Sequence, residues 1–351
     1  MRFGANYTPR RGWFHHWLDF DPAEQREDFE TLAGLGLDHV RVFCLWPLFQ
    51  PQRGLIRQRA LDDLARLYDV AAGAGLDVTV DVLQGHLSSF EFYPSWTVTH
   101  HQRNIFTDPD VVEAEAELVA AVAHRLRDHG NQLGVSLANE PNNMIAPVGR
   151  DAVTEAEVDA WITRLLTAAT EADPDHPHTH SAFDAVWYDE GHTFTPRQLT
   201  TLGARTVVHP WVFSAGIGKK YGGLSTEAAH VAEYVVELAR AWAPDPARSI
   251  WVQEIGAPAG SVTPEQAPEF AEQTVRNLAR CEGGVGCYLV VQPRCLAHDA
   301  GLPRAGVQPR PVRRARPTEA GRRASARCRR GAEAQPVAGR DSLDSGCAGR
   351  G

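Results

Sequence analysis

Short apolar runs alternate with longer segments of helical periodicity along the first 288 residues of the chain. The runs predict strands at 3–7, 39–45, 76–83, within 133–143, and at 178–183, 205–209, 249–254 and 284–288. Helical spacing predicts helices at 22–36, 61–74, 108–129, around Trp161 to Leu166, and at 226–242 and 264–281. Eight strands with intervening helices in under 300 residues predict an α/β fold, a (β/α)8 TIM barrel, with an incomplete eighth unit.

The composition changes abruptly at Leu289, which divides the predicted barrel (residues 1–288) from an Arg-rich tail (residues 289–351). The tail holds 13 Arg, no Lys and 5 acidic residues, and it lacks Phe, Trp, Tyr, Ile, Met, Lys and Asn. Such a composition cannot build an ordinary core, so the tail is predicted to be disordered or translated out of frame. Without Lys or aromatic residues it does not predict nucleic-acid binding.

The codons allow a specific form of the frameshift hypothesis. If Leu289 to Gln292 were encoded CTG GTG GTG CAG, reading one nucleotide later would give Trp-Trp-Cys-Ser. In the same shifted frame, residues 306–313 allow Glu-Tyr-Ser-Leu-Gly-Leu-Phe-Asp. We therefore expect that the chain as written is poorly soluble and nearly inactive, and that restoring the frame near Leu289 restores folding and activity.

Several classes of function are disfavoured. After the first strand the sequence GANYTPRRG is not a GxGxxG loop, and no other motif requires a cofactor, so we expect none. No signal-peptide pattern opens the chain and no run of about 18 apolar residues exists, which predicts a cytoplasmic protein without membrane association. The six Cys have no CxxC spacing, so free thiols are expected.

Two glutamates lie at the ends of predicted strands: Glu140 in LGVSLANEPNN and Glu254 in RSIWVQEIG. The carboxyl ends of barrel strands meet at one mouth, so these residues could flank one sugar ring. Retaining glycosidases need a protonated carboxyl and an ionised carboxylate about 5 to 5.5 Å apart. Apolar surroundings would keep Glu140 protonated, Arg41 on strand two would keep Glu254 ionised, and Asn139 can hydrogen-bond a sugar 2-hydroxyl.

The order Arg41, Asn139-Glu140-Pro141, His209-Pro210-Trp211 and Glu254-Ile255-Gly256 resembles the clan A glycoside hydrolases, most closely family five, the cellulases and β-mannanases. The resemblance covers about residues 1–288. It implies a retaining β-glycoside hydrolase acting on mannan-type or glucan-type chains, with Glu140 as acid/base and Glu254 as nucleophile. The family usually has Tyr where Trp211 stands, and its strand-eight Trp forms the floor of the sugar site.

Further residues are predicted to contact a carbohydrate substrate: Asn6, His86, His209, Trp211 and Trp96. Indole rings near loops stack well on sugars, so two or three of Trp13, Trp17, Trp46, Trp96 and Trp187 are expected to line a cleft.

Two other functions remain open. The first is a metal-dependent barrel hydrolase, suggested by His176, His178 and His180 and by the pairs His15-His16 and His100-His101, although we expect no metal site. The second is a catalytically impaired or non-catalytic carbohydrate-binding barrel, suggested by the unusual tail.

Overall fold

The computed structural model describes residues 2–87, 90–98, 103–145, 152–213, 216–256, 261–281 and 288–291, with the backbone alone at 288–291. The chain divides into two compact units, 1–304 and 305–351, and all described residues belong to the first. The predicted tail after 291, including any effect of a frameshift, lies outside the described residues.

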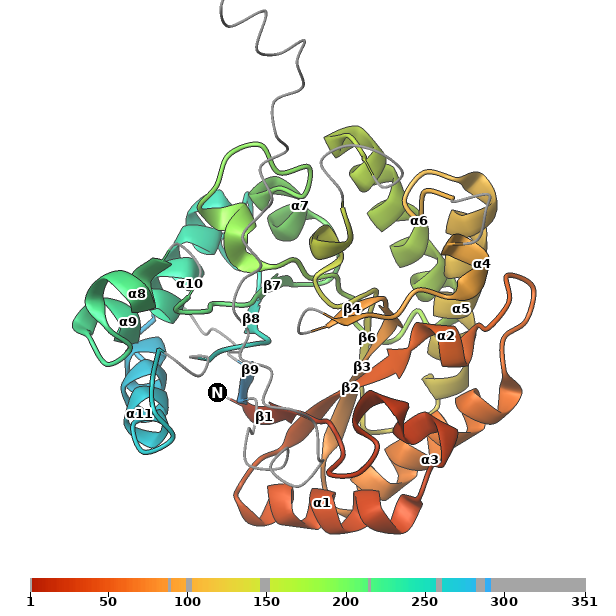
Figure 1. Cartoon of the computed structure of the whole chain (residues 1–351), viewed down its shortest axis with the longest axis horizontal. Helices are drawn as coiled ribbons and strands as arrows, with labels where there is room; N and C mark the ends of the chain where they lie inside the picture. The colour runs from red at the N-terminus through yellow and green to blue at the C-terminus, as the bar shows by residue number, and fades with distance from the viewer. Residues whose placement is uncertain are drawn as a thin grey trace, which may run out of the picture. The chain divides into compact units, whose positions relative to one another are not determined.

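A central ring of parallel strands is surrounded by helices (Figure 1). The strands of the ring are β1 (Arg2–Asn6), β2 (His39–Leu45), β3 (Asp77–Gln84), β6 (Gln132–Ser136), β7 (Thr206–Val208), β8 (Ile250–Val252) and β9 (Tyr288–Val291). Five of them form a sheet in the order β6-β3-β2-β1-β9, and β7 pairs with β8. Thr179 continues the ring from β6, because its amide donates to the Val135 carbonyl at 2.9 Å and its carbonyl accepts from the Leu137 amide at 3.0 Å.

The ring closes because the Ala204 amide donates to His178 O at 2.9 Å just before β7, while β8 contacts β9. β9 pairs in parallel with β1, with Leu289 opposite Phe3. The predicted (β/α)8 barrel is confirmed, and its eighth unit is described only as the four residues of β9.

The helices of the outer layer and the mouth are α1 (Pro22–Gly34), α2 (Trp46–Phe49), α3 (Gln58–Gly73), α4 (Ser95–Val98), α5 (Pro109–Leu126), α6 (Glu155–Ala172), α7 (Pro196–Thr201), α8 (Ile217–Tyr221), α9 (Thr226–Ala229), α10 (Val231–Trp242) and α11 (Ala267–Leu278). Short 3-10 helices η1 (Trp13–Leu18), η2 (Pro141–Met144) and η3 (Asp184–Trp187) and the hairpin β4 (His86–Leu87) and β5 (Phe90–Glu91) complete the described elements. No described helix is long and apolar enough to cross a membrane.

Local sequence fixes where several helices begin. At α5 the Asp108 side chain accepts hydrogen bonds from the amides of Asp110 and Val111, and Pro109 takes the first helical position. At α6 Thr154 and Glu157 form a reciprocal capping box. Because these caps satisfy amides that would otherwise lack partners, the helices start at defined places around the barrel.

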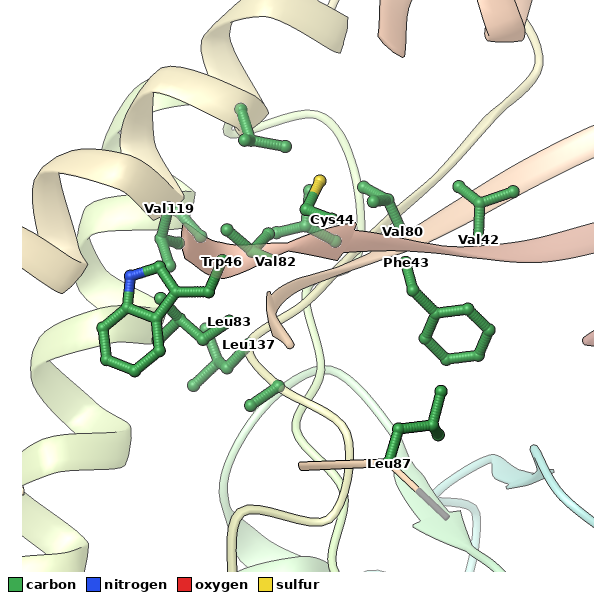
Figure 2. Close-up of a cluster of buried hydrophobic side chains, with 14 of the residues drawn as sticks. Val42, Phe43, Cys44, Trp46, Val80, Val82, Leu83, Leu87, Val119 and Leu137 are labelled. Carbon is green, nitrogen blue, oxygen red and sulfur yellow. The ribbon is translucent and has the colours of Figure 1, made fainter. Parts of the chain in front are cut away.

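The core fills the space between the strands and the helices. Figure 2 shows Val42 and Cys44 of β2 beside Val80 and Val82 of β3, with Trp46 extending toward Val119 of α5. All six side chains are at most 1% exposed. Burial of each large apolar side chain contributes roughly 1.5–3 kcal/mol, so this layer holds β2 and β3 firmly in register.

Most predicted elements differ from the structure only in their end residues, and two differ in more than that. Of the predicted fifth strand 178–183, only Thr179 makes a ladder pair, because Ser181 and Phe183 bond instead to the loop that follows β6. The predicted helix 226–242 divides into α9 and α10 at His230. Cys44 and Cys281 are free thiols as expected, while the other four Cys lie outside the described residues.

Candidate active site

Polar side chains from several strands meet at the carboxyl ends of the barrel strands. Asn6 is the last residue of β1, Arg41 lies opposite it on β2, and Glu254 follows β8 by two residues. Asn139 and Glu140 lie on the loop between β6 and η2, and His209 directly follows β7. The structure therefore brings these sequence-predicted residues into one buried cluster, at the end of the barrel where active sites form.

Arg41 is the centre of this cluster and is fully buried. Its Nη1 donates to Glu254 Oε1 at 2.6 Å and to Asn6 Oδ1 at 3.3 Å. Its Nη2 donates to Asn139 Oδ1 at 2.7 Å and also bonds Asp81. The planar guanidinium thus ties residues from four barrel segments together, which a lysine could not do with one ammonium group.

Glu140 has an unusual backbone conformation, with φ 46° and ψ 54° in the left-handed region. A non-glycine residue there costs of order 1–3 kcal/mol, and the following Pro141 disfavours the right-handed helical alternative. The Glu140 amide donates to Ser181 Oγ at 3.3 Å, which holds the turn. The side chain is consequently aimed at His209, whose Nδ1 lies 2.8 Å from Oε1, while Asn143 donates to Oε2 at 3.0 Å.

Glu254 receives hydrogen bonds on both carboxylate oxygens. Arg41 donates to Oε1, and the Trp211 indole Nε1 donates to Oε2 at 3.1 Å. Gly256 lets the indole lie against the backbone, since a Cβ at this position would approach Trp211 Cζ3 to 2.5 Å. Glu254 is 7% exposed and Glu140 8% exposed, so both residues are largely shielded from water but keep a small exposed surface.

The two carboxyl groups have opposite electrostatic environments. Burial, together with the nearby charge of Glu254, raises the pKa of Glu140 above its ordinary value. Burial also acts to raise the pKa of Glu254, but His209 and Arg41 outweigh it and leave that pKa below its ordinary value. Burial tends to lower the pKa of His209, but the carboxylates of Glu254 and Glu140 leave it raised. One carboxyl is therefore suited to hold a proton and the other to stay ionised.

The separation of the two glutamates also limits the chemistry. Oxygen atoms of Glu140 and Glu254 and a ring nitrogen of His209 all lie within 4.8 Å of one another. Inverting glycosidases hold their carboxyl groups about 6.5–9.5 Å apart to admit a water, whereas retaining ones hold them about 5–5.5 Å apart. The same three residues could in principle ligate a cation, but the Arg41 guanidinium already bonds Glu254 and would repel one.

The remaining predicted residues make contacts outside this cluster. The imidazole of His86 is half-buried, and its strand β4 contacts η2, which follows Glu140. Trp96 donates its indole N–H to Gln50 O at 3.0 Å and packs edge-on against Trp46. Trp17 and Trp46 are core residues at 4% and 0% exposure.

Trp187 is likewise buried, and Trp13 packs against Phe14 and Phe90. Of the five tryptophans predicted near a cleft, three are therefore core residues.

The histidines that suggested a metal site make other contacts. His176 Nδ1 bonds the Asp173 carboxylate at 2.9 Å, and His178 bonds the main chain at both ring nitrogens. His180 Nε2 bonds the Gln198 carbonyl at 3.3 Å. The pair His100-His101 lies outside the described residues.

Three contacts of the site were missed by sequence analysis. Asp81 was detectable as a charged residue inside the apolar run LDVTVDVL, two positions from Thr79 and therefore on the same face. Gln253 Oε1 accepts a hydrogen bond from His209 Nε2 at 2.9 Å, and Gln253 directly precedes Glu254 in the sequence. Asn143 gave no signal beyond its closeness to Glu140 in sequence.

Comparison with solved structures shows the family to which the chain belongs. A GH5_18 protein from Streptomyces cattleya, in complex with GlcNAc, is 49% identical with a TM-score of 0.79, covering 83% of this chain and 70% of that chain. The chain belongs to glycoside hydrolase family 5, subfamily 18 (GH5_18). A GH5_18 protein from Bifidobacterium longum subsp. infantis is 43% identical, with a TM-score of 0.79 and coverage of 83% and 69%.

The GH5_18 chain has more distant structural relatives as well. The exo-β-1,4-mannosidase of Opitutaceae bacterium strain TAV5 is 24% identical with a TM-score of 0.69, covering 83% of this chain and 51% of that one, and supports the fold alone. The Streptomyces cattleya protein has also been solved as a Glu-to-Ala variant in complex with Manβ1-4GlcNAc. No family model and no curated protein matches the chain. This GH5_18 chain is a glycoside hydrolase, in agreement with the predicted family.

Proposed function

We propose that this GH5_18 chain hydrolyses β-mannosidic bonds, with Manβ1-4GlcNAc as the preferred substrate, and that the anomeric configuration is retained. The observation that supports this best is the pair Glu140 and Glu254, with oxygens within 4.8 Å of each other and pKa values shifted in opposite directions. The Manβ1-4GlcNAc complex of the Streptomyces cattleya relative supports the choice of sugar, which narrows the broader mannan or glucan expectation.

In the first half-reaction a Glu254 oxygen attacks the anomeric carbon while the bond from that carbon to the glycosidic oxygen breaks. Glu140 transfers its proton to the departing oxygen, so the leaving sugar departs as a neutral alcohol. The products of this step are a glycosyl ester on Glu254 and an ionised Glu140.

In the second half-reaction Glu140 acts as a base. It removes a proton from a water whose oxygen attacks the anomeric carbon from the face that the leaving group vacated. The ester bond breaks, Glu254 returns to its carboxylate form, and Glu140 is again protonated. Two inversions at the same carbon give net retention.

Residues that contact the two glutamates contribute to both half-reactions. Arg41 and Trp211 orient the Glu254 carboxylate, and their hydrogen bonds favour its ionised form. Asn139 accepts from Arg41 through Oδ1, which leaves its Nδ2 to donate to the sugar 2-hydroxyl. Such a bond strengthens in the transition state and contributes to the rate.

The test is hydrolysis of Manβ1-4GlcNAc, mannobiose and cellobiose, with the first-formed anomer identified by NMR. Glu140→Ala and Glu254→Ala are each expected to abolish turnover of the disaccharide. Azide should rescue Glu254→Ala on an activated aryl β-mannoside and release the α-mannosyl azide. Full activity in either variant, or α-mannose as the first product of the parent chain, contradicts the mechanism.

We also propose that the tail after Leu289 is translated out of frame, because seven residue types vanish there inside the strand β9. All kinetic measurements are therefore made on the chain as written and on the chain with the frame restored by deleting one nucleotide near codon 289. The restored chain is expected to be more soluble and far more active. A chain that as written unfolds cooperatively, protects its tail from protease and turns over substrate at the same rate contradicts the frameshift.

A further inference from the structure

Two stacked phenylalanines lie near the residues that contact Glu140 and Glu254. The rings of Phe183 and Phe213 have centroids 6.0 Å apart and an interplanar angle of 22°. Phe213 also contacts the Trp211 ring at 5.6 Å. Because Trp211 donates to Glu254, this aromatic surface extends continuously from the nucleophile side of the site to the pair, which we call the Phe183–Phe213 platform.

The Phe213 ring is exposed, although the two residues before it are packed or hydrogen-bonded. Phe213 is 44% exposed, although the residue before it, Val212, is buried in a separate hydrophobic cluster with Val231 and Phe270. The Trp211 amide donates to Asp184 Oδ2 at 3.0 Å, which ties the loop after β7 to the segment that carries Phe183. Exposure of an apolar ring to water is unfavourable, and exposed apolar patches often mark sites where a ligand binds.

The platform is also connected to Glu140. Asn142 of η2 accepts from the Phe183 amide at 2.8 Å and donates to the Phe183 carbonyl at 3.4 Å. The next residue, Asn143, donates to Glu140 Oε2. The acid that protonates a leaving oxygen must stand beside the leaving sugar, and Phe183 is hydrogen-bonded to the same short helix that contacts this acid.

We propose that the Phe183–Phe213 platform binds the leaving-group sugar, an N-acetylglucosamine-type pyranose, by stacking against its ring. This inference rests on the proposed function and adds the place of the second sugar. A pyranose with equatorial substituents presents axial C–H groups on its faces, and the N-acetyl methyl adds apolar area. Both suit an aromatic surface, and neither requires a charged partner.

The test uses the full chain with GlcNAc as the probe, measured by saturation-transfer difference NMR and titration. Phe213→Ala and Phe183→Ala are expected to weaken GlcNAc binding roughly 3- to 10-fold, the range for loss of one aromatic contact. Phe213→Trp should restore binding. Phe90→Ala is the matched control, because Phe90 is 45% exposed but contacts Trp13 and Phe92 instead. Thermal melts establish that each variant is folded.

Kinetics separates this inference from the proposed function. In the active chain, Phe213→Ala should lower kcat/KM for Manβ1-4GlcNAc by the same factor and have a smaller effect on kcat/KM for β-mannosyl fluoride, which has no leaving sugar. If the disaccharide is hydrolysed but Phe213→Ala changes neither binding nor kcat/KM, or if Phe90→Ala is equally harmful, the platform assignment is wrong. If GlcNAc binding depends on Phe213 but no β-mannoside is cleaved, the platform stands and the proposed function fails.

Discussion

Replacing Trp211 by Phe tests how the low pKa of Glu254 is maintained. The change removes the indole N–H that donates to Glu254 Oε2 at 3.1 Å and keeps an aromatic ring at the position. A hydrogen bond to a charged group contributes about 1.5–3 kcal/mol in favour of the ionised form, so its loss should raise the pKa of Glu254. Because Trp211 is half-buried and water can enter the vacated space, we expect the lost free energy to lie at the lower end of that range.

The expected signature is a shift of the acidic limb of the pH profile. Glu254 must be ionised to attack, so kcat/KM falls as the pH drops through its pKa, and a raised pKa moves that limb to higher pH. The plateau near neutral pH should change by less than about tenfold, since Glu254 is ionised there in both proteins and its bond to Arg41 remains.

Initial rates on an aryl β-mannoside across acidic and neutral pH give the position of the acidic limb of the kcat/KM profile. Trp211→Tyr is the matched variant, because a phenol keeps aromatic bulk and can donate to the carboxylate. We expect its acidic limb to lie closer to that of the parent chain. An unmoved limb in Trp211→Phe, or an equal shift in Trp211→Tyr, would falsify the assignment of the indole N–H as a determinant of the Glu254 pKa.

Two glycines give further predictions. Gly256→Ala should displace the Trp211 ring, which lies 2.5 Å from the added Cβ, and move the acidic limb in the same direction as Trp211→Phe; an unchanged profile contradicts the contact. Gly134→Ala should lower the free energy of unfolding by about 2–6 kcal/mol, because φ is 93° and the Cβ would lie 1.9 Å from Pro177 O. Gly34→Ala, at the exposed end of α1 with open space around it, is the control and should stabilise by about 0.5–1 kcal/mol in urea titrations.

The barrel could be predicted because its strands are continuous apolar runs between helical segments. Strand β2 matches the predicted 39–45 to the residue, since every side chain in it is buried and the run has clear ends. The fifth strand was not predictable in the same way. There Ser181 and Phe183 bond the loop that follows β6, and these side-chain and main-chain contacts replace a ladder that the local sequence alone would allow.

The sequence predicted several side chains of the buried cluster but not the geometry that brings them together. Glu140 was expected at the end of a strand, and it lies four residues beyond Ser136, in a left-handed turn that the contact with Ser181 helps to hold. Arg41 was expected to pair with Glu254, and it does. The second carboxylate on Arg41, from Asp81, depends on the register of β2 and β3, where Arg41 lies opposite Thr79. The sequence marks Asp81 as a charged residue inside an apolar run, but it does not show that its partner is Arg41.

Asp81 completes the charge arrangement that the proposed mechanism needs. Arg41 is fully buried between two carboxylates, Asp81 and Glu254. When Glu254 forms the glycosyl ester it loses its charge, and a buried guanidinium with no other partner would then carry a penalty of several kcal/mol. The ion pair with Asp81 leaves Arg41 with a charged partner while Glu254 is esterified, which lowers the cost of neutralising Glu254. The same fixed pair remains to receive the carboxylate when water releases the sugar.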